Sequence, residues 1–127
     1  NTEELIVVDY KSQANRRPVE VWSYLSSVYH QGYKIQLDFY AYLLKKMKFK
    51  VAKTGYFLVC NGNKEANGFY GNLKFSETLI PYDTSTDWIE NEVDRMYDLM
   101  NDTDLPKHNI SCENCAYAAR RAEFENL

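Results

Sequence analysis

The pattern of apolar and polar positions predicts a chain of mixed strands and helices. A short β-branched run at residues 5–10 (LIVVDY) predicts a buried strand, and a polar loop follows at residues 12–18 (SQANRRP). Residues 35–47 carry an apolar side chain at every fourth position, which predicts the clearest helix of the chain. A weaker helical spacing covers residues 19–33, and Gly32 is expected to interrupt it.

The second half of the chain predicts two extended segments and two further helices. Residues 51–63 (VAKTGYFLVCNGN) predict a strand that ends in a turn near Asn61, and residues 69–82 predict a second extended stretch. Thr84, with an Asp three positions later, resembles a capping box for a helix over residues 89–100. A short helix is expected in the tail.

This order of elements predicts the fold class. Strand, helix, two strands and helix are typical of an α/β (α+β) fold with a mixed central β-sheet flanked by helices. The strand at residues 5–10 is apolar on both faces, so we expect it inside the sheet. A length of 127 residues fits a single domain spanning residues 1–127.

Composition narrows the function classes. The formal net charge of −3 argues against a protein that coats nucleic acid through bulk charge, although a locally basic groove is compatible with it. No apolar stretch approaches the roughly 20 residues needed to span a bilayer. Three cysteines, an odd number, fit a reducing compartment, so a cytoplasmic location is expected.

Asp9 and Lys11 form the first candidate for chemistry. Side chains at i and i+2 of a strand project to the same side, about 7 Å apart along the backbone. The carboxylate could bind Mg²⁺ or Mn²⁺, and the ammonium could orient a water or stabilise charge on a phosphate. The competing interpretation is a surface ion pair worth under about 1 kcal/mol.

Gln36 and Tyr40 form the second candidate. They lie four residues apart on the predicted helix and therefore share a face. Such a pair could position a nucleic-acid strand or brace the strand that carries Asp9 and Lys11. The alternative is a core tyrosine beside a glutamine that merely begins the helix.

In order and spacing, VVDYKS followed by QLDFY resembles the PD-(D/E)XK nuclease superfamily, specifically its RecB-like branch. The resemblance implies a restriction-endonuclease-like core that hydrolyses DNA phosphodiester bonds with Mg²⁺ or Mn²⁺, as in exonucleases of DNA repair, recombination or phage defence. It makes Asp9 a metal ligand, Lys11 the catalytic lysine, and Gln36 and Tyr40 an accessory pair. A helicase-like or other protein partner is compatible with it, and the oligomeric state is left open.

The chain departs from the family pattern at its start. The family places another metal-binding Asp on a strand before the D/E-x-K strand, whereas only NTEE precedes Leu5 here. Glu3 and Glu4 are not persuasive substitutes. We therefore expect an N-terminally truncated domain that cleaves weakly or not at all alone, within an intact parent that could be active.

Two rival interpretations follow from this departure. One is a nuclease-like fold retained as a catalytically inactive module for DNA binding or protein docking. The other is an α/β domain unrelated to nucleases, in which Lys11 and Gln36 would face different sides.

The cysteines depart from the family pattern as well. Cys112 and Cys115 match the first two of a C-x2-C-x5-C trio that holds an iron–sulfur cluster in some relatives, but Arg121 takes the third position. We therefore expect no cluster. A zinc site that includes His108 is conceivable, but a lone C-x-x-C gives it thin support.

Basic residues near the candidate site could contact DNA. Arg16 and Arg17 follow Lys11 in the polar loop, and Lys45 and Lys46 crowd the end of the main helix. We expect them to bind phosphates. For the lysines, a solvated face that complements the helix C-terminus is an equally good interpretation.

Overall fold

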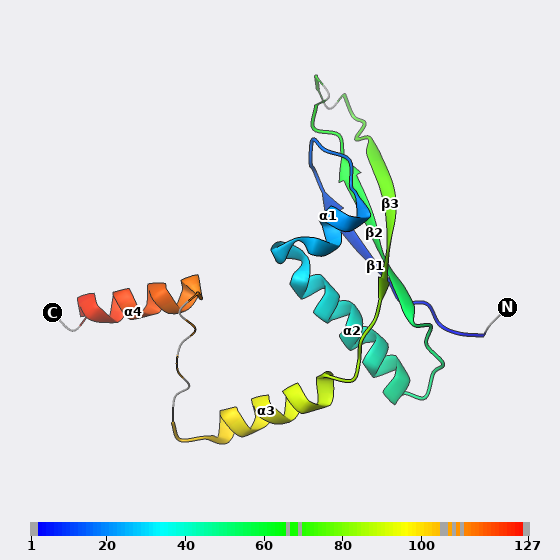
Figure 1. The fold of residues 1–127 in the computed structure, drawn as a ribbon. Helices are drawn as coiled ribbons and strands as arrows, with labels where there is room; N and C mark the ends of the chain where they lie inside the picture. The colour runs from blue at the N-terminus through cyan, green and yellow to red at the C-terminus, as the bar shows by residue number, and fades with distance from the viewer. Residues whose placement is uncertain are drawn as a thin grey trace. The chain divides into compact units, whose positions relative to one another are not determined.

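The computed structural model describes residues 3–65, 67–68, 70–104, 107, 109 and 111–125. Its centre is a three-stranded sheet of β1 (Val8–Gln13), β2 (Thr54–Gly62) and β3 (Phe75–Asp83), in the order β1-β2-β3 (Figure 1). β1 runs parallel to β2, and β2 pairs antiparallel with β3. The sheet is therefore mixed.

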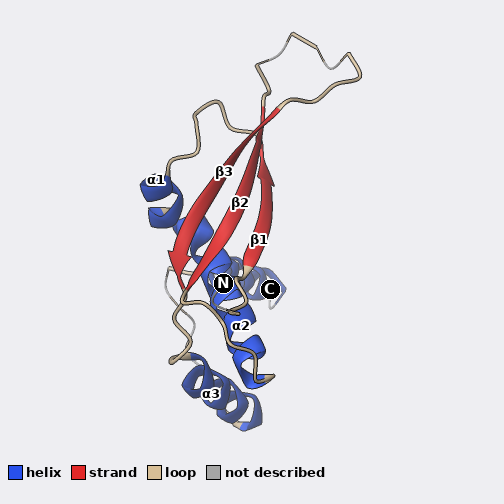
Figure 2. Cartoon of the chain, turned by 90° about the vertical axis from the view of Figure 1, so that its right-hand side faces the viewer, coloured by secondary structure: helices blue, strands red, loops and turns tan. Residues whose placement is uncertain are grey.

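The helices between β1 and β2 make the crossover that a parallel strand pair requires. They are α1 (Val21–Ser26), the short 3₁₀ turn η1 (Val28–His30) and α2 (Gln31–Lys46). Figure 2 shows α2 passing behind the sheet. The predicted mixed sheet flanked by helices is confirmed, and it is the architecture of a restriction-endonuclease-like core.

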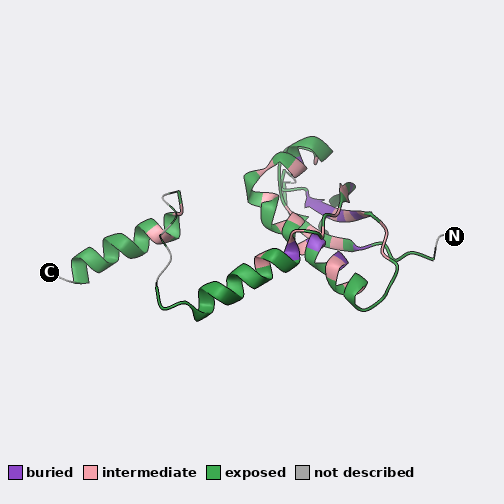
Figure 3. Cartoon of the chain, turned by 60° about the horizontal axis from the view of Figure 1, so that its bottom comes forward, coloured by how far each residue is buried: buried purple, intermediate pink, exposed green. Residues whose placement is uncertain are grey.

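The core lies between this helical layer and one face of the sheet. Phe57 and Val59 of β2 are fully buried, because alternate residues of a central strand point to the same side. Leu37 of α2 packs against them, in the region coloured purple in Figure 3. Gly55 allows this close approach, since a Cβ there would lie 3.0 Å from both Leu37 Cδ2 and the Val7 carbonyl oxygen.

The other face of the sheet is exposed within the described part of the chain. Val8, Tyr10 and Leu79 each keep more than half of their surface in contact with solvent. The prediction that the first strand lies inside the sheet is wrong, because in the described part of the chain β1 is an edge strand that pairs with β2 alone. An apolar run shows that both faces of a strand are hydrophobic. It does not show whether another layer of the protein packs on each face.

The first strand also runs further than its apolar residues suggest. β1 continues to Gln13, so Asp9 and Lys11 lie within the strand rather than at its end. Leu5 makes only an isolated bridge to Val51. Backbone pairing with β2 extends β1 through polar positions that a hydrophobic pattern assigns to a loop.

Two other local predictions, the helix break at Gly32 and the cap at Thr84, are wrong. The weak helix at residues 19–33 breaks at Ser27, whose backbone is extended, whereas Gly32 lies inside α2. The predicted strand end near Asn61 is confirmed, since β2 ends at Gly62, although Asn61 itself still pairs with Ser76 of β3. The Thr84 hydroxyl donates to the Lys53 carbonyl at 3.0 Å, so it does not cap α3 (Ile89–Asn101).

The apolar stripe that predicts α2 is not its buried face. Ile35, Phe39, Leu43 and Met47 are all exposed, and the buried side chains of the helix are Leu37, Asp38 and Ala41. The periodicity correctly predicts a helix. It does not indicate which side meets the sheet, because the buried face includes a carboxylate.

The chain divides into two compact units, residues 1–89 and residues 90–127. The first contains the sheet and α2, and the second contains α4 (Glu113–Glu125) and nearly all of α3. Most side chains of α3 and α4 are exposed, as their green colour in Figure 3 shows. The single-domain organisation stays a prediction. No helix in the described residues is long and apolar enough to cross a membrane.

Candidate active site

Lys11 is the centre of a cluster that joins β1 to α2. Its Nζ lies 2.9 Å from Asp9 Oδ2, because the two side chains share one face of the strand. The same ammonium donates a hydrogen bond to Gln36 Oε1 at 2.7 Å. Lys11 and Gln36 therefore face each other, which contradicts the interpretation in which they lie on different sides.

Gln36 extends the cluster along α2. Its Nε2 donates to the Tyr40 hydroxyl at 2.6 Å, as expected for residues four apart on a helix. The amide thus accepts from Lys11 on one side and donates to Tyr40 on the other. The structure brings together all four residues that the two sequence motifs single out.

The Asp9–Lys11 pair is shielded from solvent. Only 13% of the Asp9 side chain and 19% of the Lys11 side chain are exposed. The Lys11 ammonium also lies 4.2 Å from the centroid of the Tyr33 ring, which adds a cation–π contact. Since screening by water is weaker here than at the surface, the pair differs from the exposed ion pair of the competing interpretation.

The carboxylate of Asp9 is only partly satisfied. Oδ2 is inaccessible to water, and its 2.9 Å contact with Lys11 Nζ lacks hydrogen-bond geometry. Its attraction to the ammonium is therefore mainly Coulombic. Burial without a hydrogen-bond donor is unfavourable for this oxygen, and a further donor or ligand would offset that cost.

Comparison with known families decides which class of protein has this site. The family model of the PD-(D/E)XK nuclease superfamily matches residues 1–120. The chain belongs to the PD-(D/E)XK nuclease superfamily. No curated protein and no solved structure gives a significant match. Membership in this superfamily points to nuclease-type chemistry, with DNA as substrate and a divalent metal ion as the usual cofactor.

Asp9 fits such a metal ion as one ligand. Mg²⁺ is commonly bound through one or two carboxylates, with waters and substrate phosphates supplying the remaining oxygens. The shielded carboxylate of Asp9 has the right chemistry for this role. Among the described residues no group of three or more His, Cys, Asp or Glu side chains gathers around it, so most ligands would come from elsewhere.

The basic residues expected to bind DNA lie in two separate places. Arg16 follows β1 and forms an exposed ion pair with Glu65 at 2.7 Å, and Arg17 is its neighbour. Lys45 and Lys46 lie in the last turn of α2, roughly 14–15 Å along the helix from Gln36. The structure therefore places the two arginines in the loop after β1 and the two lysines at the far end of α2.

Asn61 positions the loop that carries the arginines, and sequence reasoning missed it. The side chain is 8% exposed, and its Oδ1 accepts from the Asn15 backbone N–H at 2.7 Å. Its Nδ2 donates to the Asn15 carbonyl at 3.0 Å. The sequence signal for this role is an asparagine at the end of an apolar strand. An Asn-Gly pair is also typical of a turn, so the sequence by itself predicts a turn here.

Asp38 is the second residue that sequence reasoning missed. It is 4% exposed and accepts three hydrogen bonds, from the Ser85 backbone N–H at 2.8 Å, the Tyr82 hydroxyl at 3.2 Å and Trp88 Nε1 at 3.3 Å. It lies two residues from Gln36 but faces the sheet. Asp38 thus fixes α2, and with it Gln36, against the end of β3.

The three free cysteines are divided between the two compact units of the chain. Cys60 is buried in β2, whereas Cys112 and Cys115 lie at the start of α4. The Cys115 backbone N–H donates to Cys112 Sγ at 3.4 Å and lowers the pKa of that thiol. His108 lies outside the described residues, and the expected lack of an iron–sulfur cluster stays a prediction.

Proposed function

We propose that this protein is a metal-dependent DNA nuclease that hydrolyses phosphodiester bonds at the Asp9–Lys11 cluster. The observation that carries the proposal is the 2.7 Å hydrogen bond from Lys11 Nζ to Gln36 Oε1, which links the two motifs. The order of D-x-K on a strand and Q-x3-Y on the following helix supports the RecB-like branch. On the same basis we place the protein among exonucleases of DNA repair, recombination or phage defence.

The chemistry assigned to each residue follows from its contacts. Lys11 holds its charge where negative charge develops on a phosphoryl group, which stabilises the transition state. Gln36 fixes the direction of that ammonium, and Tyr40 fixes the amide of Gln36. Asp9 would hold the divalent ion, which when bound supplies Lewis-acid stabilisation of the phosphoryl oxygens.

One observation favours a second function, a catalytically inactive module that binds DNA or docks a protein. Asp9 is the single carboxylate of the described cluster, and an ammonium 2.9 Å from one of its oxygens repels a second cation. A carboxylate held in this way would bind a metal weakly unless further ligands join it. The basic loop could then still bind phosphates without cleaving the strand.

The experiment that separates the two functions is a cleavage assay on end-labelled linear DNA with Mg²⁺ or Mn²⁺. It uses the natural full-length protein, with Asp9→Asn as the test variant and Asp94→Asn, an exposed α3 position, as the matched control. The proposal predicts that Asp9→Asn abolishes cleavage and that Asp94→Asn does not. Binding without cleavage in all three proteins would establish the inactive module instead.

A further inference from the structure

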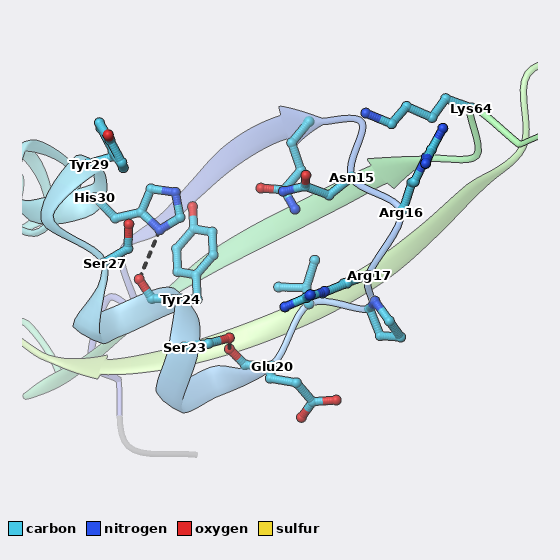
Figure 4. A pocket seen from close by; sticks show the side chains of 13 residues that line it. Asn15, Arg16, Arg17, Glu20, Ser23, Tyr24, Ser27, Tyr29, His30 and Lys64 are labelled. Carbon is cyan, nitrogen blue, oxygen red and sulfur yellow. Dashed lines mark hydrogen bonds between the residues drawn. The ribbon is translucent and has the colours of Figure 1, made fainter.

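A pocket of about 530 Å³ lies beside the Asp9–Lys11 cluster, and Arg16 and Arg17 of the basic loop form part of its wall (Figure 4). It is bounded by the loop after β1 and by α1 and η1. Gln13 lines it, two positions beyond Lys11 on the same face of β1 and hence about 7 Å along the strand. Its volume is in the range of about 300–1,000 Å³ that is usual for small-ligand sites.

The charges on the pocket wall suit a phosphate. Arg16, Arg17 and Lys64 line it, against the single carboxylate of Glu20. Arg16 is paired with Glu65, but neither Arg17 nor Lys64 forms an ion pair with another described residue. These two cations are available to an incoming anion, and arginine in particular can bind phosphate oxygens through two hydrogen bonds.

The opposite wall is aromatic. The rings of Tyr24 and His30 lie side by side in Figure 4, with centroids 4.1 Å apart. His30 Nδ1 lies 2.8 Å from the Tyr24 carbonyl oxygen. Because a carbonyl can only accept, Nδ1 must donate, which leaves Nε2 as the ring nitrogen that can interact with a ligand.

Tyr24 supplies an unused hydrogen-bonding group. Its side chain is only 4% exposed, and its hydroxyl has no hydrogen-bond partner in the described chain. Burial, together with Tyr33 and Asp9, raises the pKa of Tyr24 to about 12, so the hydroxyl keeps its proton at neutral pH. An unpaired buried donor is unfavourable, and an acceptor that enters the pocket would relieve it.

We propose that this pocket is a nucleotide subsite, which holds one nucleotide of a DNA strand next to the Asp9–Lys11 cluster. Arg17 and Lys64 bind the phosphate, and the base lies against His30 and the exposed ring of Tyr29, which also lines the pocket. The choice of a nucleotide as ligand rests on the proposed nuclease function. The nucleotide is either the phosphorylated end of a strand or an internal residue turned out of its stack, since both present the same chemistry.

The test is a titration of the ¹⁵N-labelled protein with deoxythymidine 5′-monophosphate, followed by NMR. We expect shifts in the amides of residues 15–20 and 24–30, and an affinity about tenfold weaker in Arg17→Gln. Tyr24→Phe, which removes only the hydroxyl, should weaken binding severalfold. Arg120→Gln on α4 removes the same charge from an exposed position and serves as the matched control. Pocket amides that do not shift, or equal affinities for Arg17→Gln and Arg120→Gln, would overturn the proposal.

Oligonucleotides distinguish the two sources of the nucleotide. If the pocket takes a strand end, removing the 5′-phosphate from octathymidylate weakens binding. If it takes an internal nucleotide, both forms bind alike and Arg17→Gln weakens both. Failure of Arg17→Gln to weaken either would refute the subsite.

These readouts are independent of cleavage. Nucleotide binding without DNA cleavage would leave the subsite standing and remove the nuclease proposal. DNA cleavage that is unaffected by Arg17→Gln, in a protein that does not bind the monophosphate, would do the reverse.

Discussion

At the scale of single residues, Lys11 is held by three different interactions. Asp9 attracts its charge, Gln36 accepts a hydrogen bond from it, and the face of the Tyr33 ring lies 4.2 Å from its Nζ. Together they restrict a side chain that is otherwise flexible and strongly hydrated. An ammonium that is oriented before substrate binds need not be reoriented during the reaction, which is the basis of electrostatic catalysis.

Gln36→Ala tests this orientation. We predict a cleavage rate about tenfold lower than wild type, because Lys11 loses its only amide acceptor in the cluster while Asp9 keeps its charge in place. Stability should fall by no more than about 1 kcal/mol, since one hydrogen-bonding side chain is removed. Single-turnover cleavage and thermal unfolding measure the two effects.

Gln31→Ala is the matched control for that prediction. Gln31 lies on the same helix, and its side-chain amide donates to the Ser27 carbonyl at 3.1 Å. It should cleave DNA at the wild-type rate. Equal rates for the two variants would show that Gln36 does not position Lys11.

The residues of the Asp9–Lys11 cluster could be predicted from the sequence. The residues that hold α2 and the loop after β1 in place could not. Asp9 with Lys11 and Gln36 with Tyr40 are separated by two and four positions, so strand and helix periodicity alone places each pair on one face. The side chains of Asn61 and Asp38 form hydrogen bonds with partners that lie 44 to 50 positions away in the chain. Such contacts follow from tertiary packing, which no local pattern encodes.

At the scale of elements, α2 is anchored by a buried carboxylate. Asp38 accepts from Tyr82, Ser85 and Trp88, all of which lie at the end of β3 or in the connection that follows it. Helical periodicity alone would favour an apolar residue here. The hydrogen bonds of Asp38 fix the rotation and the axial position of α2 against the sheet. They thereby determine where Gln36 contacts Lys11.

Asp38→Ala is predicted to destabilise the protein by about 2–4 kcal/mol, because three donors lose a charged acceptor and two of them belong to large side chains. Urea denaturation measures the change. Asp94→Ala, at an exposed position of α3, is the control and should change stability by less than about 0.5 kcal/mol. A loss as small as that of the control would mean that α2 is not anchored through Asp38.

The packing of α1 against the sheet predicts a response to alkaline pH. Burial raises the pKa of Tyr24 from 10.0 to about 12, so the folded state keeps a proton that the unfolded chain releases. The resulting stabilisation is complete below pH 10 and is lost as the pH rises toward 12. Tyr24→Phe should flatten this decline, as measured by urea midpoints between pH 9 and pH 12. An equally steep decline in the variant would show that Tyr24 does not titrate in this way.

At the scale of the whole molecule, the fold class could be predicted from the sequence. Which faces of the sheet and of α2 are covered by other elements could not. The order of strand and helix signals indicates a mixed sheet, and the long helical crossover at residues 14–53 allows β1 and β2 to pair in parallel. The exposed outer face of the sheet and the exposed stripe of α2 are apolar in sequence. An apolar sequence indicates that a surface is favourable to bury. It does not indicate whether another described part of the chain packs against that surface.

Likewise, the net charge of the chain does not show how its charged side chains are distributed. The formal charge of the chain is −3, yet Arg16, Arg17 and Lys64 gather around one pocket beside the cluster. The division into residues 1–89 and 90–127 places this pocket and the Asp9–Lys11 cluster within the first unit. The chemistry proposed for the protein therefore belongs to that unit.

The most direct test of the nuclease assignment is the rate of DNA cleavage after Lys11→Ala, in the natural full-length protein with Mg²⁺ or Mn²⁺. We predict a single-turnover rate at least about a hundredfold lower than wild type, because the ammonium that stabilises the transition state is lost. Lys50→Ala, an exposed position after α2, should retain the wild-type rate. Cleavage by Lys11→Ala as fast as by wild type would contradict the account.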